Sequence, residues 1–91
     1  IAVFDNGFIN VNALNAYKHL FDEGRMLYSY NYVHRKEDVF SEGTHGAYVL
    51  STMAANLPGK FIGTAPEANY LLFTTEDDDH ETIMEELHWA E

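Results

Sequence analysis

The apolar and polar positions of this chain follow two different periods in turn. Short apolar runs have the length and composition of strands, at residues 1–5, 26–33 and 70–75. Between and after these runs, apolar residues recur at helical spacing, at about residues 10–24, 45–56 and 80–90. Strands that alternate with helices predict an α/β fold built in layers, with a mainly parallel sheet.

The predicted helices carry start and stop residues. In the first helix, Asn10 or Asn12 can cap the start and Gly24 provides the stop. In the last helix, Asp78 and Glu81 have the spacing of a capping pair. The apolar stripes of the three helices are Leu14, Tyr17, Leu20 and Phe21; Ala47, Leu50, Met53, Ala54 and Leu57; and Ile83, Met84, Leu87 and Ala90. The second helix is rich in small residues, so we expect it to pack closely against the sheet.

The second predicted strand is rich in tyrosine. Four residues two positions apart would share one of its faces: Met26, Tyr28, Tyr30 and Tyr32. Core or interface packing is our interpretation of this face, and a recognition surface is the alternative. The charged stretch 34–43 predicts a loop, and the Leu-Pro-Gly-Lys sequence at 57–60 predicts a turn.

Composition narrows the function classes. The chain has 91 residues and no linker, repeat or low-complexity stretch, so we expect one domain. Without cysteine it has no disulfide, no Cys-ligated zinc site and no Cys nucleophile. A net charge of −10 makes nucleic acid a poor partner, and no apolar run has the ~18 residues of a membrane span. The chain opens inside a strand pattern and closes inside a helix pattern, so we expect a piece of a larger domain.

Asp5 and His45 are the candidate catalytic residues. Asp5 ends a buried strand, where α/β folds place ligands, although an Asp here also serves as a turn cap. His45 opens a helix, whose N-terminus favours the neutral imidazole that a general base needs; the alternative is a packing or capping role. A carboxylate at a strand end can orient an imidazole at the start of a neighbouring helix. We therefore expect the two side chains to meet.

The motifs around these residues resemble those of the subtilisin-like serine peptidases, the subtilases. The run Ile1 to Phe8 is similar to the motif around the catalytic Asp of that family. The run His45 to Ala55, which starts His-Gly and ends Ala-Ala, is similar to the motif around the catalytic His. Gly63-Thr64-Ala65-Pro66 resembles the Gly-x-Ala-Pro segment that follows in subtilases. The resemblance covers most of the chain and identifies it as the N-terminal part of a subtilase catalytic domain, residues 1–91.

The resemblance implies a three-layer, subtilisin-like α/β fold, here incomplete. It implies a secreted or cell-envelope serine endopeptidase of a bacterium, acting on peptide or protein substrates with no cofactor. Asp5 would orient His45, and His45 would be the base. The three serines, Ser29, Ser41 and Ser51, lack the Gly-Thr-Ser context of the nucleophile. The nucleophile would lie in the remainder of the catalytic domain, which activity requires, and the 91 residues alone would be inactive.

The sequence departs from the family pattern in several places. Ala47 replaces a usual Thr, and Tyr48 replaces a common His. The turn at 57–61 is short in a region where many subtilases bind calcium, so we expect no calcium site from the resemblance. A different alignment would place Glu42 at the position of the base. It needs three extra residues before Ala54, so we prefer His45.

Other interpretations of the chain remain open. A subtilase-like domain that only binds or assembles is the main alternative function. A phosphotransfer domain with Asp5 as nucleophile would want an acidic residue where Gly7 stands. The sequence at 80–84 lacks the second His of a zinc-protease helix, and the acidic run 77–79 lacks the spacing of a cation loop. His19, His34 and His88 have no evident partners in the sequence.

Overall fold

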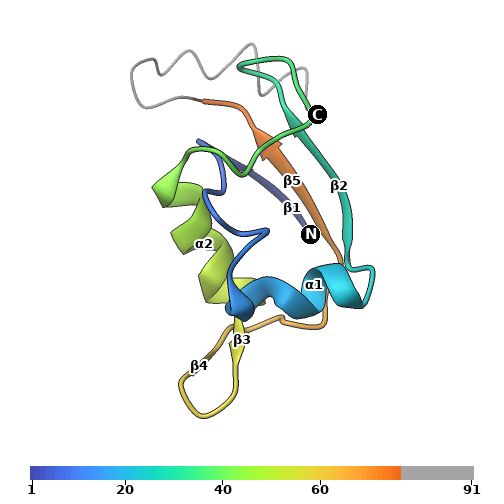
Figure 1. The fold of residues 1–91 in the computed structure, drawn as a ribbon, viewed down its shortest axis with the longest axis vertical. Helices are drawn as coiled ribbons and strands as arrows, with labels where there is room; N and C mark the ends of the chain where they lie inside the picture. Colours follow the sequence, from blue (N-terminus) through green and yellow to red (C-terminus); the bar gives the residue numbers. More distant parts are fainter. Residues whose placement is uncertain (77–91) are drawn as a thin grey trace.

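Three parallel strands form the main sheet, within a computed structural model that describes residues 1–76. In spatial order they are β1 (Ala2–Asp5), β5 (Tyr70–Thr74) and β2 (Met26–Asn31), as Figure 1 shows. Both outer strands run parallel to the central one. The chain is therefore an α/β domain with a parallel sheet, as the alternation of strands and helices predicts.

The ends of the three strands are aligned. Asp5 of β1 pairs with Thr74 of β5, and Thr74 pairs with Asn31 of β2. All three residues are buried. Because parallel strands end at the same edge of a sheet, this edge gathers polar side chains in an otherwise apolar core.

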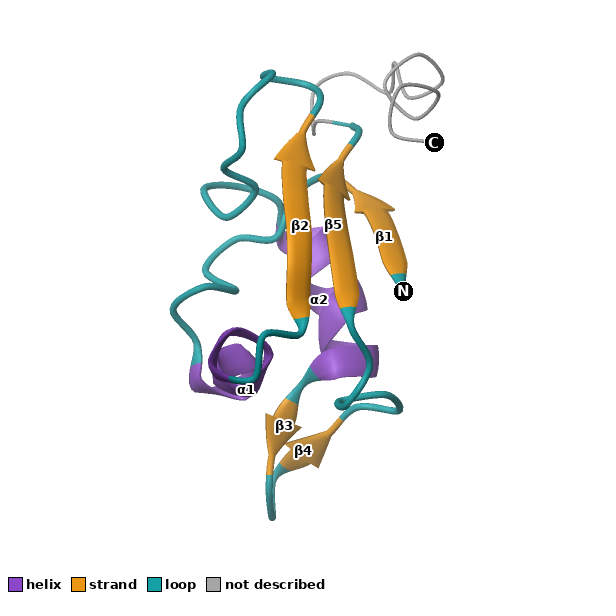
Figure 2. Cartoon of the chain, turned by 90° about the vertical axis from the view of Figure 1, so that its right-hand side faces the viewer, coloured by secondary structure: helices purple, strands orange, loops and turns teal. Residues whose placement is uncertain are grey.

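One face of the sheet is covered by helix α2 (Thr44–Ala54) and by the segment that connects β1 to β2. That segment contains the 3-10 turn η1 (Asn15–Tyr17) and helix α1 (Lys18–Asp22). Side chains from all these elements form a single buried cluster: Val3, Phe8, Val11, Tyr17, Leu20, Val39, Leu50, Ala54, Ala55, Tyr70 and Leu72. In Figure 2, α2 lies behind the sheet, and no described element lies in front of it.

The connection from β1 to β2 and the connection from β2 to β5 cross this same face of the sheet in opposite directions, so they have opposite hands. With the strands pointing up in Figure 2, the chain goes from β2 through α2, behind the sheet, to β5 on the right of β2. This is a left-handed crossover, whereas about 98% of such connections are right-handed. As a result, residues 1–76 cover only one face of the sheet.

The first helix is shorter than the sequence predicts. Asn10 adopts a left-handed conformation, with φ of 62°, and lies in a turn instead of capping a helix. Its carbonyl accepts the N–H groups of Ala13 and Leu14 in a turn, and helical structure begins only at Asn15. Leu14 and Phe21 of the predicted stripe are exposed. The predicted stop at Gly24 is confirmed: its φ is 67°, and Arg25 N–H donates to Leu20 O at 2.7 Å, as at many helix ends.

The prediction that Met26 shares one face of the strand with Tyr28, Tyr30 and Tyr32 is wrong for Met26. Met26 pairs with Tyr70 and Tyr28 pairs with Leu71, so Leu27 is an extra residue in a β-bulge. The bulge turns Met26 toward the core, where it packs against the buried cluster, and leaves Tyr28 on the opposite face. A bulge breaks the two-residue period, which is why the sequence pattern hides it.

The predicted turn at 57–60 is the tip of a hairpin that the sequence does not reveal. Helix α2 ends at Ala54, and the antiparallel strands β3 (Asn56–Leu57) and β4 (Phe61–Ile62) follow. The hairpin projects beyond the sheet in Figure 1. Leu57 thus belongs to β3 and not to the stripe of α2. The last predicted helix lies outside the described residues, and no described helix is long and apolar enough to cross a membrane.

Candidate functional site

Asp5 is the acidic half of the candidate site. The apolar residues of β1 carry it to the polar edge of the sheet, where its side chain is only 7% exposed. The backbone N–H of Asn6 donates to its Oδ1 at 2.7 Å. A buried carboxylate requires such donors, because it has lost its water.

His45 is the basic half, in the first turn of α2. Its Nδ1 lies 2.8 Å from Oδ1 and 2.9 Å from Oδ2 of Asp5, so the contact that the sequence predicts is present. The carboxylate can only accept, so Nδ1 carries the proton in this pair. The neutral ring then has a lone pair on Nε2, and the side chain is 70% exposed to solvent. Such an imidazole can take a proton from an approaching hydroxyl and return it later.

The pair changes the acidity of the imidazole. The hydrogen bond that His45 Nδ1–H donates to Asp5 and the charge of the same carboxylate raise the pKa of His45 above its ordinary value of 6.5, and the charge of Glu76 adds to the effect. The N-terminus of α2 favours the neutral ring, but the carboxylate favours the charged one. Asp5 would therefore stabilise the imidazolium that forms when His45 accepts a proton.

Three glycines allow α2 to approach β1 closely enough for this contact. A Cβ on Gly46 would lie 1.9 Å from the carbonyl oxygen of Gly7. Gly7 and Gly43 have φ of 128° and 95°, and a Cβ on either would clash with the backbone of the other segment. The sequence interpretation noted Gly7 and Gly46 in their motifs but missed Gly43, which precedes the helix as a residue of left-handed conformation.

Asn6 is a second contributor that the sequence interpretation missed. Its Oδ1 accepts the backbone N–H of Gly46 at 3.1 Å, so it caps α2 from another segment of the chain. Its own N–H holds Asp5, as described above. Asn6 therefore joins the strand that carries the carboxylate to the helix that carries the imidazole. Its position next to Asp5 was the only signal in the sequence.

The loop 34–43 fixes the entry into α2. Backbone N–H groups of Phe8, Ile9 and Asn10 donate to carbonyls of this loop. His34, which had no evident partner in the sequence, forms an ion pair with Glu42, Nε2 to Oε1 at 2.8 Å. Glu42 is thus engaged by His34, while His45 contacts Asp5, which agrees with the choice of His45 over Glu42.

The Gly-x-Ala-Pro segment holds the other end of α2. The N–H groups of Gly63, Thr64 and Ala65 donate to the carbonyls of Ala55, Thr52 and Met53, at 2.8, 3.0 and 2.7 Å. The carbonyl of Pro66 lies 3.0 Å from Nε2 of His19, which gives this histidine a partner as well. This motif therefore has a structural role at the C-terminal end of the helix.

The three serine hydroxyls are engaged with groups other than His45. Ser51 donates to the carbonyl of Tyr48 at 2.6 Å, Ser29 to that of Glu37 at 3.5 Å, and Ser41 to the carboxylate of Asp38. None of these contacts resembles a nucleophile beside a base. Next to Asp5 in the sheet, Oγ1 of Thr74 is the one buried side-chain polar atom of residues 1–76 without a hydrogen-bond partner.

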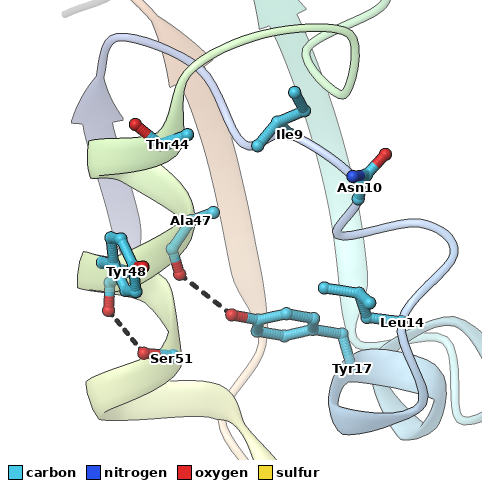
Figure 3. Close-up of a pocket in the computed structure, with 8 residues that line it drawn as sticks. All are labelled: Ile9, Asn10, Leu14, Tyr17, Thr44, Ala47, Tyr48 and Ser51. Carbon is cyan, nitrogen blue, oxygen red and sulfur yellow. Dashed lines mark hydrogen bonds between the residues drawn. The ribbon is translucent and has the colours of Figure 1, made fainter.

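A pocket of about 320 Å³ lies between α2 and the segment that leads into η1 (Figure 3). Its lining is mostly apolar: Ile9, Asn10, Leu14, Tyr17, Thr44, Ala47, Tyr48 and Ser51. The hydroxyl of Tyr17 donates to the carbonyl of Ala47 at 2.9 Å across its floor. From α2 the pocket is lined by Thr44, Ala47, Tyr48 and Ser51, and His45 is not among the lining residues.

Residues 1–76 hold no group of three His, Asp or Glu side chains that could bind a metal ion. The acidic run 77–79 and His88 lie outside the described residues. Comparisons with protein-family models, with curated proteins and with solved structures find no match to this chain.

Proposed function

We propose that Asp5 and His45 are the Asp and His of a serine peptidase catalytic triad of subtilisin type. The observation that carries the proposal is the contact between Nδ1 of the exposed His45 side chain and the buried carboxylate of Asp5. The motifs around both residues support it, as does the parallel sheet. The three-layer fold and the secreted or cell-envelope location are part of this proposal.

The reaction would be acyl transfer to a serine that lies outside these 91 residues. The serine Oγ attacks the peptide carbonyl, and Nε2 of His45 takes the proton from that hydroxyl. Asp5 keeps the ring in the Nδ1–H tautomer and stabilises its charged form. His45 then gives this proton to the leaving amine. Water later attacks the acyl group on the serine, and His45 takes a proton from that water and returns it to the serine oxygen.

The geometry weighs against the phosphotransfer alternative. Both oxygens of the Asp5 carboxylate lie within 2.9 Å of His45 Nδ1, and Oδ1 also accepts the N–H of Asn6. A carboxylate that attacks phosphorus needs an oxygen with open access, but this side chain is only 7% exposed. The engaged carboxylate suits an orienting role better.

A serine-directed fluorophosphonate probe tests the proposal on the polypeptide made from the complete reading frame. We expect the wild type to be labelled, and His45→Ala to lose labelling rate and peptide turnover by several orders of magnitude. His19→Ala is the matched control, because it removes a histidine whose Nε2 lies against the carbonyl of Pro66 and not against a carboxylate.

The same experiment identifies the alternative. If the folded complete polypeptide takes no probe and cleaves no peptide, the peptidase proposal fails and a binding or assembly domain replaces it. If His45→Ala keeps the wild-type rate, His45 is not the base. The 91-residue chain should take no probe in either case.

A further inference from the structure

Thr74 places a buried hydroxyl beside the carboxylate of Asp5. The two residues pair in the register of β1 and β5, and Thr74 is only 1% exposed. Asp5 follows Val3 by two positions and Thr74 follows Leu72 by two, and both Val3 and Leu72 belong to the buried cluster that α2 covers. Because side chains two positions apart share one face of a strand, the hydroxyl and the carboxylate lie on the α2 side of the sheet.

The hydroxyl and the carboxylate have complementary hydrogen-bonding needs. Oγ1 of Thr74 has no partner within residues 1–76, and a buried hydroxyl without a partner is costly. Oδ1 of Asp5 accepts the backbone N–H of Asn6, and both carboxylate oxygens face Nδ1 of His45. Each of these oxygens has two lone pairs, so Oδ2 can accept a further donor. Neighbouring strands are about 4.8 Å apart, and a change of the Thr74 rotamer brings its hydroxyl toward Oδ2.

We infer that the hydroxyl of Thr74 donates a hydrogen bond to Oδ2 of Asp5 and takes up part of the negative charge that this carboxylate presents to His45. Thr74 is then a positioning residue that acts on His45 through Asp5. The carboxylate favours the charged imidazole, whereas a general base must be neutral before it can take a proton. A donor on the carboxylate weakens its preference for the charged ring. This consequence for catalysis rests on the proposed function; the hydrogen bond itself does not.

Asn31, on the other side of Thr74, is the weaker partner for the hydroxyl. It pairs with Thr74 from β2 and is also buried. Its Oδ1 already accepts the backbone N–H of His34 at 2.9 Å, and its Nδ2 donates to the carbonyl of Asp38 at 3.3 Å. Its amide oxygen is neutral, and hydrogen bonds to an ionised oxygen are about twice as strong as those between neutral groups. The carboxylate of Asp5 is therefore the better acceptor.

The pKa of His45, measured by nitrogen NMR in the 91-residue chain, tests the inference. Thr74→Val removes the hydroxyl and keeps the size of the side chain, so we expect the pKa of His45 to rise by about 0.5 pH units above the wild-type value. Thr74→Ser keeps a hydroxyl and should stay within about 0.2 pH units of the wild type. Glu76, the other charged group that acts on His45, is the same in all these variants.

Thr75→Val is the matched control. It makes the same substitution at the adjacent buried threonine, whose contact with Asp5 is a backbone N–H that the variant keeps. We expect it to leave the pKa of His45 unchanged. An unchanged or lowered pKa in Thr74→Val would overturn the inference. So would equal rises in Thr74→Val and Thr75→Val, or a rise in Thr74→Ser as large as that in Thr74→Val.

A second measurement needs no substitution at position 74. In the wild type, the hydroxyl proton of Thr74 should exchange with water slowly enough to give its own resonance, because it is buried and hydrogen-bonded. Asp5→Asn should shift this resonance. A hydroxyl proton without a resonance, or one that Asp5→Asn leaves in place, would contradict the inference, and the second result would point to Asn31 as the acceptor.

The pH dependence of turnover then connects the hydrogen bond to the proposed function. In the polypeptide made from the complete reading frame, the acid limb of kcat/KM should move to higher pH in Thr74→Val, by the shift that NMR measures for His45. If that polypeptide cleaves no peptide, the proposed function fails while the NMR titration still decides the role of Thr74. An acid limb that stays in place in an active Thr74→Val enzyme would overturn the role of Thr74 in catalysis.

Discussion

The two ends of helix α2 are held by different chemistry. At the N-terminal end, side chains make the contacts: the Asp5 carboxylate accepts the Nδ1–H of His45, and Oδ1 of Asn6 accepts the backbone N–H of Gly46. At the C-terminal end, backbone N–H groups of residues 63–65 reach the last carbonyls. A contact made by side chains depends on which residues are present, whereas one made by the backbone tolerates many. The identity of the side chains therefore matters more at the N-terminal end of α2, which holds the Asp5–His45 pair, than at its C-terminal end.

Glycines sharpen the comparison. Gly46 lies in the helix and touches the backbone of Gly7, whereas Gly59, with φ of 82°, lies at the hairpin tip with no atom within 4 Å of its would-be Cβ. The first glycine allows two segments to meet, and the second only allows the chain to turn. Their substitution by alanine should therefore act by different mechanisms.

The largest expected effect is that of Gly46→Ala. In an open helix, Gly→Ala stabilises by up to about 1 kcal/mol, but here the new Cβ would be 1.9 Å from the Gly7 carbonyl oxygen. We expect a loss of more than about 3 kcal/mol in the free energy of unfolding, measured by urea denaturation. Gly59→Ala should cost only about 1–2 kcal/mol, for its left-handed conformation alone. A neutral or stabilising Gly46→Ala would show that α2 does not need this close approach.

The next effect separates the side-chain cap from the backbone cap. Asn6→Ala removes the acceptor of the Gly46 N–H and should cost about 1 kcal/mol of stability in the same urea assay. Thr64→Ala, at the other end of α2, keeps the backbone N–H that reaches the Thr52 carbonyl and loses only a 3.4 Å contact of the exposed Thr64 hydroxyl with the same carbonyl, so it should change stability by less than about 0.5 kcal/mol. Equal costs for the two variants would remove the distinction between the ends.

A smaller, pH-dependent effect belongs only to the N-terminal end. The folded state raises the pKa of His45, so this group stabilises the fold fully below its unfolded pKa of about 6.5. That contribution is lost as the pH rises through the folded pKa. The gap in urea midpoint between wild type and His45→Gln should therefore be wider at pH 5.5 than at pH 9. A gap that widens toward pH 9 would mean that the sign of the shift is wrong.

Much of this arrangement could be predicted from the sequence, and the failures have physical causes. The strand at residues 1–5, the start of α2 and the meeting of Asp5 with His45 follow from local motifs. The bulge at Leu27 and the turn at Asn10 do not, because one extra residue in a strand and one residue of positive φ leave the apolar pattern of the sequence unchanged. The cap from Asn6 to Gly46 was not predicted, because an Asn followed by Gly is typical of a local turn and does not indicate a contact with a distant helix.

The tautomer and pKa of His45 test the central claim most directly, and nitrogen NMR of the labelled chain measures both. We predict a neutral ring with its proton on Nδ1, a pKa above 6.5, and a lower pKa in Asp5→Asn, where the orienting charge is gone. A proton on Nε2 in the wild type, together with a His45 pKa that Asp5→Asn leaves unchanged, would contradict the claim that Asp5 prepares His45 to act as a base.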